Sequence, residues 1–224
     1  MLYKAAEHIK AVVKAKPDAL LALSAGEDCL RLYEKLAEKQ QAGEICFAKT
    51  RFFAVTELCG LAPEDARSIQ NTLRVRFLDR VEANRQNCVF LSEGNWEEYD
   101  ALIRENGGID LAILALGNNA RIGFNEPATP FDSLTHRQKL TDSSRQELAA
   151  VFSGTEDVPE YGLTMGIRTL VSARDILVIS VGESRADAVF KTLYGRNDSV
   201  VPAAFLQIPL NVTVYLDEAS AQKL

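Results

Sequence analysis

The chain has 224 residues, of which 47% are hydrophobic and 25% charged, which is the composition of a soluble globular protein with a full core. A formal net charge of −6 argues against a nucleic-acid backbone or an anionic membrane as the main partner.

Targeting and metal signals are absent from the sequence. No apolar run is long enough to span a bilayer, and the N-terminal residues M-L-Y-K-A-A-E-H lack the apolar core of a signal peptide. The cysteines (Cys29, Cys46, Cys59 and Cys88) show no C-x-x-C spacing, and the only histidines are His8 and His136. We therefore expect reduced thiols, a cytoplasmic location and no metal site.

The first half of the chain alternates between helical and strand patterns. Helical spacing of apolar residues predicts helices over residues 3–15, 29–36, 64–80 and 96–105. Short apolar runs predict strands over residues 19–23, 52–55 and 88–91. The first of these strands ends at Ser24-Ala25-Gly26, directly before a helix. A strand, a glycine turn and a helix in this order form an arrangement that binds anions at the helix N-terminus.

The second half continues the alternation around one irregular stretch. Strands are predicted over residues 111–116, 175–182, 203–206 and 212–216, and a helix begins at residues 183–185. Residues 161–173 read as a short helix-like segment. Residues 128–160 are polar, with a weak helix over 145–152, and this length between firm elements is typical of a lid or a surface loop. We call residues 128–160 the lid segment.

This order of elements predicts an α/β protein. We expect a three-layer α/β/α, mostly parallel, Rossmann-like sheet of about seven strands, built as a single domain over residues 1–224. Several predicted strands end in loops that contain glycine, and parallel connections leave such loops at one edge of the sheet. Ligands of open α/β sheets bind at that edge.

The most informative stretch runs from Asp110 to Pro127 and reads D-L-A-I-L-A-L-G-N-N-A-R-I-G-F-N-E-P. Six apolar residues lead into Gly117-Asn118-Asn119, followed by the lone cation Arg121 and the Asn125-Glu126-Pro127 step. A buried parallel strand that ends in such a loop delivers backbone amides and polar side chains to the ligand edge.

Five segments together resemble a known family. They read L-A-L-S-A-G, F-F-A-V-T-E-L-C-G-L, L-A-L-G-N-N-A-R-I-G-F-N-E-P, Y-G-L-T-M-G and V-I-S-V-G-E-S-R. This order is similar to that of glucosamine-6-phosphate deaminases and galactosamine-6-phosphate isomerases, from about residue 5 to the end. The G-x-x-x-x-I-x-F-N-E-P block is the specific part, because the related 6-phosphogluconolactonases lack Asn-Glu-Pro there.

The resemblance implies a small-molecule ligand, an aminosugar 6-phosphate in its linear form, and no metal or organic cofactor. In this family a carboxylate base moves a proton between C2 and C1 of the sugar. Ammonia is then released, and the product is fructose 6-phosphate or tagatose 6-phosphate. A homo-oligomer is compatible with it.

Candidate catalytic residues follow from the resemblance position by position. The family's base aspartate falls on Thr56, and its acidic neighbour matches Glu57. Asn119 is an ordinary family variant. The ring-opening histidine is replaced by Arg121, which stays protonated, and the glutamate that partners this histidine matches Glu126. We expect Arg121 to form an ion pair with Glu126 or Glu57.

The candidate phosphate loop also departs from the family pattern. The family's T-G-G-T/S-P becomes Ala25-Gly26-Glu27-Asp28-Cys29, so Gly26, Glu27 and Asp28 are the candidate substrate-binding residues there, with Arg185 in place of the family's lysine. Asp28 is expected to cap the following helix itself, which would fill the anion site from within.

Three functions remain open from the sequence. The first is an aminosugar-6-phosphate isomerase or deaminase with lost or altered activity. The second is a catalytically degenerate sugar-binding or regulatory protein, motivated by the changes at Thr56, Arg121 and the phosphate loop. The third is a lactonase-like hydrolase.

Overall fold

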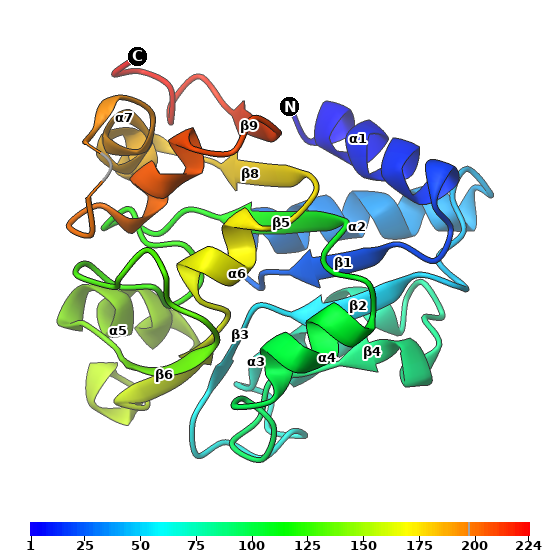
Figure 1. The fold of residues 1–224 in the computed structure, drawn as a ribbon, viewed down its shortest axis with the longest axis horizontal. Helices are drawn as coiled ribbons and strands as arrows, with labels where there is room; N and C mark the ends of the chain where they lie inside the picture. The colour runs from blue at the N-terminus through cyan, green and yellow to red at the C-terminus, as the bar shows by residue number, and fades with distance from the viewer. Residues whose placement is uncertain (197) are drawn as a thin grey trace.

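A six-stranded parallel sheet forms the centre of the computed structural model, which describes residues 1–196 and 198–224. The strand order is β4-β2-β1-β5-β8-β9, and every pairing is parallel. The strands are β1 (Leu20–Leu23), β2 (Arg51–Ala54), β4 (Cys88–Val89), β5 (Leu111–Ala115), β8 (Ile176–Ser180) and β9 (Val212–Leu216). Their carboxyl ends share one edge, at the left in Figure 1.

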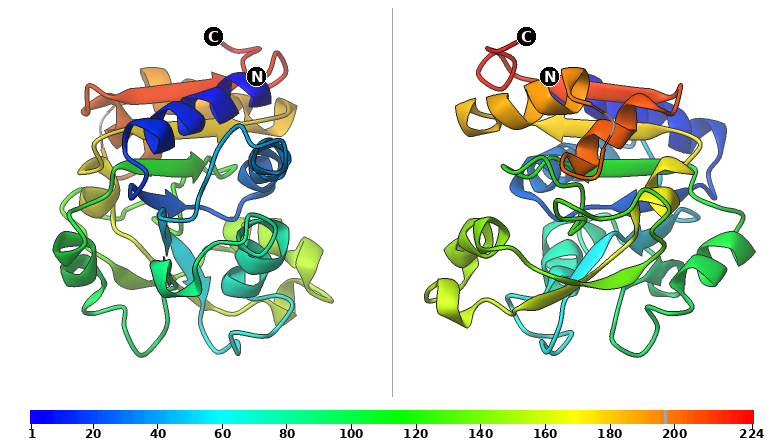
Figure 2. Two further views of the ribbon diagram at one scale, coloured as in Figure 1. Left: turned by 90° about the vertical axis from the view of Figure 1, so that its right-hand side faces the viewer. Right: turned by 60° about the vertical axis from the view of Figure 1, so that its left-hand side comes forward.

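Helices cover both faces of this sheet (Figures 1 and 2). Successive strand residues point to opposite faces, so Leu21 and Leu23 join one apolar cluster while Leu20 and Ala22 join the other. The first face carries α1 (Leu2–Ala15), α2 (Glu27–Gln41), α3 (Ile69–Leu73) and a π-helical turn, η1 (Arg74–Leu78). The second carries α4 (Tyr99–Glu105), α6 (Ile167–Val171) and α7 (Ala186–Tyr194). The predicted three-layer α/β/α fold is confirmed.

A second, antiparallel sheet adjoins the carboxyl end of β2. It has the order β3-β7-β6, with β3 (Thr56–Leu58), β7 (Tyr161–Thr164) and β6 (His136–Lys139). With α5 (Asp142–Leu148) it forms the lower left part of Figure 1. The lid segment therefore contains a strand and a helix, and the described strands number more than the seven expected because three of them lie in this small sheet.

Short 3-10 segments complete the secondary structure. They are η2 (Arg85–Asn87), η3 (Ala149–Val151), η4 (Thr155–Asp157), η5 (Glu183–Arg185) and η6 (Pro202–Gln207). None of the helices over residues 1–196 and 198–224 is long and apolar enough to cross a membrane.

Three sequence predictions of secondary structure were wrong in type or extent. The strand expected over residues 203–206 is the 3-10 helix η6, because a short buried apolar run reads the same in both conformations. The helix-like reading of residues 161–173 covers β7 as well as α6. The helix expected from residue 64 begins only at Ile69, after Ser68, whose side chain accepts a hydrogen bond from the Asn71 amide at 3.0 Å.

Candidate functional site

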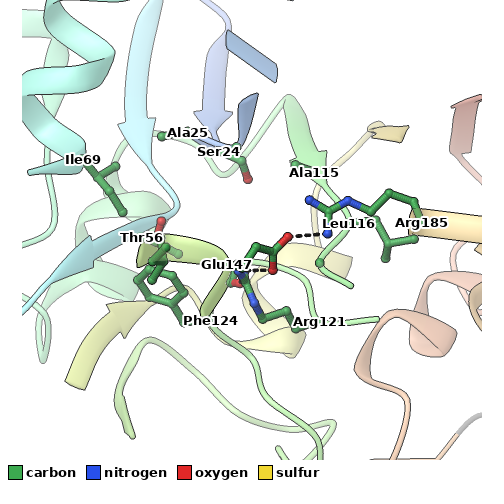
Figure 3. A pocket seen from close by; sticks show the side chains of 14 residues that line it. Ser24, Ala25, Thr56, Ile69, Ala115, Leu116, Arg121, Phe124, Glu147 and Arg185 are labelled. Carbon is green, nitrogen blue, oxygen red and sulfur yellow. Dashed lines mark hydrogen bonds and ion pairs between the residues drawn. The ribbon is translucent and has the colours of Figure 1, made fainter. Parts of the chain in front are cut away.

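A small pocket opens at the carboxyl edge of the parallel sheet (Figure 3). Its volume is about 110 Å³. It lies where the loops after β1, β2, β5 and β8 meet, and α5 of the lid segment closes its remaining side. The polar and glycine residues that line it include Ser24, Gly26, Thr56, Arg121, Glu147 and Arg185. A cavity therefore lies at the edge of the sheet where the sequence predicts ligand binding.

Two arginines in this pocket share one carboxylate (Figure 3). Nη2 of Arg121 lies 3.0 Å from Oε2 of Glu147, and Nη1 of Arg185 pairs with Oε1 of the same side chain. Arg121 also donates from Nη1 to the carbonyl oxygen of Gly123 at 2.5 Å. The predicted ion pair of Arg121 with Glu126 or Glu57 is wrong, since the partner comes from α5 of the lid segment.

Glu126 instead joins the site loop to the lid segment. Its Oε2 accepts hydrogen bonds from Nδ2 of Asn119 at 2.8 Å and from Oγ1 of Thr141 at 3.1 Å, and the side chain is almost fully buried. Thr141 is also the N-cap of α5 and accepts from the Ser144 amide. Glu126 therefore holds the first turn of α5 against the loop that carries Asn119.

The loop around Asn119 has a constrained backbone. Ala120 has φ of 60°, a left-handed conformation that side chains with a Cβ rarely adopt. Oδ1 of Asn119 accepts from the Arg121 amide at 3.2 Å, and Asn125 donates from Nδ2 to the carbonyls of Ile122 and Met165. These bonds hold the turn in the shape that aims Arg121 into the pocket.

Thr56 and Glu57 occupy different places. Thr56 lines the pocket, whereas Glu57 does not, because consecutive strand residues point to opposite sides. The Glu57 carboxylate accepts hydrogen bonds from the amides of Ile69 and Gln70 at the start of α3, at 2.9 and 2.8 Å. It also accepts from the Leu58 amide at 2.7 Å. Burial raises the pKa of Glu57 and the amide bonds only partly offset this, so the structure gives it a capping role.

The loop before α2 keeps its backbone amides uncapped. Gly26 is the N-cap residue, and no side chain caps the helix. Glu27 is exposed and faces Arg31 and Arg76 at 3.7 and 3.5 Å. Asp28 accepts instead from the Val181 amide at 3.1 Å, so the prediction that it caps α2 is wrong. Burial raises the pKa of Asp28 against the opposing effects of that amide and of Arg185.

Two polar residues of the pocket were not among the candidates from the sequence. Glu147 lies on a polar helix without any motif, and only the tertiary structure brings it to the arginines. Ser24 is buried and lines the pocket, and none of the described residues forms a hydrogen bond with its hydroxyl. The position of Ser24 directly after a predicted strand was the available signal.

The remaining polar candidates lie elsewhere. Cys59 is buried outside the pocket, and burial raises the pKa of its thiol, which suits a structural residue. His136 is on β6, where its Nδ1 lies 2.8 Å from the Leu134 carbonyl. Within the part of the chain that the structure describes, no group of three or more His, Cys, Asp or Glu side chains is placed to hold a metal ion.

Comparisons with known proteins identify relatives of this chain. The sequence profile described as "Glucosamine-6-phosphate isomerases/6-phosphogluconolactonase" matches residues 1–215. A glucosamine-6-phosphate deaminase from Bacillus velezensis is 37% identical over 225 aligned residues, covering 97% of this chain and 93% of the relative. Another from Rhodopirellula baltica is 39% identical, covering 95% and 87%.

Solved structures agree with these sequence matches. The structure of a monomeric glucosamine-6-phosphate deaminase superposes with a TM-score of 0.96 at 31% identity, covering 100% of this chain and 95% of the other. A 6-phosphogluconolactonase from Leishmania guyanensis gives a TM-score of 0.77 at 18% identity, covering 100% and 94%, and this likeness concerns the fold alone.

Proposed function

Because the chain belongs to the family of glucosamine-6-phosphate isomerases and 6-phosphogluconolactonases, we propose that it binds an aminosugar 6-phosphate and converts it with release of ammonia. The observation that carries the proposal is the pocket at the carboxyl edge. There two arginines line the cavity, and the bonded Asn119–Glu126 pair lies in the loop that carries one of them. The chain is similar along nearly its whole length to proteins named as deaminases.

The proposed reaction needs a proton acceptor near C1 and C2 of the open-chain sugar. A proton leaves C2 and is returned to C1, and water then replaces the nitrogen, which departs as ammonia and leaves a ketose 6-phosphate. Thr56 cannot take up that proton near neutral pH, and Arg121 stays protonated. Among the lining residues in the described ranges, Glu147 is the one carboxylate, so we assign the proton transfer to it. Two guanidinium groups make it a weak base, so the assignment applies to the state in which Glu147 no longer pairs with Arg121 and Arg185.

A second function rests on a specific observation. The residue at the family's base position is a threonine that faces the pocket, while the neighbouring Glu57 is committed to the start of α3. This arrangement favours a protein that binds a sugar phosphate without turning it over. The four free cysteines support a reducing, cytoplasmic setting for either function.

Ammonia release from glucosamine 6-phosphate and galactosamine 6-phosphate separates the two. If the protein is an enzyme, the wild type releases ammonia and the Glu147→Gln variant does not. The Glu160→Gln variant, which removes the same charge from an exposed position of the lid segment, should release ammonia like the wild type. A binding protein shows a ligand-induced rise in Tm with no ammonia above the buffer control. In that case, Thr56→Asp combined with Arg121→His is expected to create measurable release.

A further inference from the structure

The positive charge of the pocket is already matched by a residue of the protein itself. The side chains of Arg121, Arg185 and Glu147 are 12%, 20% and 18% exposed. At this degree of burial, salt screens their interactions only weakly. Each oxygen of the Glu147 carboxylate faces a different guanidinium group, and Figure 3 shows both contacts inside the cavity. Glu147 therefore occupies the place that any incoming anion would have to take.

Hydrogen-bond donors around this carboxylate remain unused. Ser24 is 94% buried and lines the pocket (Figure 3), and its hydroxyl has no hydrogen-bond partner among the residues that the structure describes. Nε of Arg121 is likewise buried without a hydrogen-bond partner within residues 1–196 and 198–224. Gly26 brings the uncapped N-terminus of the fifteen-residue helix α2 to the same cavity. A buried donor without an acceptor is costly, so this set indicates a ligand with several acceptor oxygens and negative charge.

Charge balance prevents Glu147 and a phosphate monoester from sharing the arginines. The two guanidinium groups supply two positive charges, and Glu147 supplies one negative charge. A phosphate monoester carries about 1.5 to 2 negative charges near neutral pH. With Glu147 in place the phosphate would bring an excess of buried negative charge, whereas without it the charges nearly cancel.

We propose that Glu147 is a specificity-determining residue that competes with the phosphate of the ligand for Arg121 and Arg185, so that phosphate binds only when α5 releases them. The proposal rests on the proposed function for its choice of a sugar phosphate. A ligand without phosphate does not meet this competition, so the residue sets the preference of the pocket between phosphorylated and unphosphorylated sugars.

The attachment of α5 permits such a release. Its first turn is held through Thr141 and Glu126. The Glu147 end is held by the two arginine contacts and by Leu148, which is half-buried and packs on an apolar cluster. Arg145 donates to the carbonyls of Thr155 and Val158, so these later residues are tied to α5 and would move with it. The expected motion is a swing of the lid segment about Thr141.

Binding of inorganic phosphate and of glucosamine 6-phosphate, measured by titration calorimetry at low ionic strength, tests the proposal. We expect Glu147→Gln to bind both at least about tenfold more tightly than the wild type, because it removes the competing charge and keeps the side-chain shape. Glu160→Gln, which removes an exposed charge from the same segment, is the matched control and should bind like the wild type. Equal affinities of Glu147→Gln and Glu160→Gln, or no phosphate binding by either, would overturn the proposal.

Hydrogen exchange of the wild type gives a second test that needs no substitution at Glu147. Saturating phosphate should speed amide exchange over residues 142–148, since α5 loses its contacts with the arginines. Unchanged or slower exchange there would count against the proposal even if the Glu147→Gln protein failed to fold. Neither readout requires turnover. Absent ammonia release by the wild type, together with tighter phosphate binding by Glu147→Gln, therefore rejects the proposed reaction alone. Ammonia release by the wild type, together with equal phosphate affinities of the wild type and Glu147→Gln, rejects this inference alone.

Discussion

Replacement of Glu126 tests whether one buried carboxylate couples the site loop to the lid segment. The Glu126→Ala substitution removes the acceptor of the 2.8 Å bond from Asn119 and of the 3.1 Å bond from Thr141. It also removes a contact from the Thr141 amide at 3.4 Å, which is too long to contribute much. The start of α5 then loses its connection to the loop that carries Asn119.

The expected loss of stability follows from these contacts. A hydrogen bond to a charged group contributes about 1.5 to 3 kcal/mol, and removing the carboxylate also removes its own cost of burial, so we expect a net loss of about 2 to 3 kcal/mol. For a chain of this size that corresponds to a fall in Tm of about 4 to 12 °C. Glu126→Gln keeps one oxygen for the two stronger donors, and we expect it to cost about 1 kcal/mol.

Urea unfolding of the three proteins, followed by circular dichroism, measures these differences. Hydrogen exchange should in addition lose protection over residues 142–148 in the Glu126→Ala protein before the parallel sheet is affected. A loss below about 1 kcal/mol for Glu126→Ala, or equal losses for the Ala and Gln variants, would refute the reasoning.

Two further predictions concern stability. Burial opposes the charge of Asp110, but hydrogen bonds from Lys16 and a buried amide outweigh it and hold its pKa below the usual range. The contribution of ionised Asp110 to the free energy of unfolding is therefore present above the unfolded-state pKa of about 3.9, and it is lost as pH falls through the lower folded value. In urea unfolding, Asp110→Asn should destabilise the protein by about 2 kcal/mol at pH 7 and by far less at pH 3. A Cβ added at Gly166 would lie 2.1 Å from a lid-segment carbonyl, so Gly166→Ala should lower Tm much more than Gly43→Ala, where the φ of +71° adds strain but no atom lies within 4 Å. Equal Tm values for the two would contradict the close approach.

Periodicity and local composition were sufficient for the central sheet. β1, β2, β5 and β8 are short apolar runs that end at glycine or polar residues, and both of their faces are buried under helices. Such strands are legible in sequence because every position must be apolar. The composition of the sequence did not predict the small sheet β3-β7-β6 in this way. β6 reads H-R-Q-K and is only half covered, so its conformation depends on pairing with β7 and not on its own composition.

The sequence by itself determined the family and the edge of the sheet at which the pocket lies, and it predicted a loss of proton-acceptor chemistry at Thr56 and Arg121. Those conclusions depend on residue identity and order along the chain. Only the tertiary structure decided the hydrogen-bond and ion-pair partners of the site residues, because these depend on side-chain direction and on segments that are distant in the sequence. Glu57 faces away from the pocket because its strand neighbour Thr56 faces into it. Glu147, 26 residues beyond Arg121, meets both arginines because α5 folds back over the carboxyl edge.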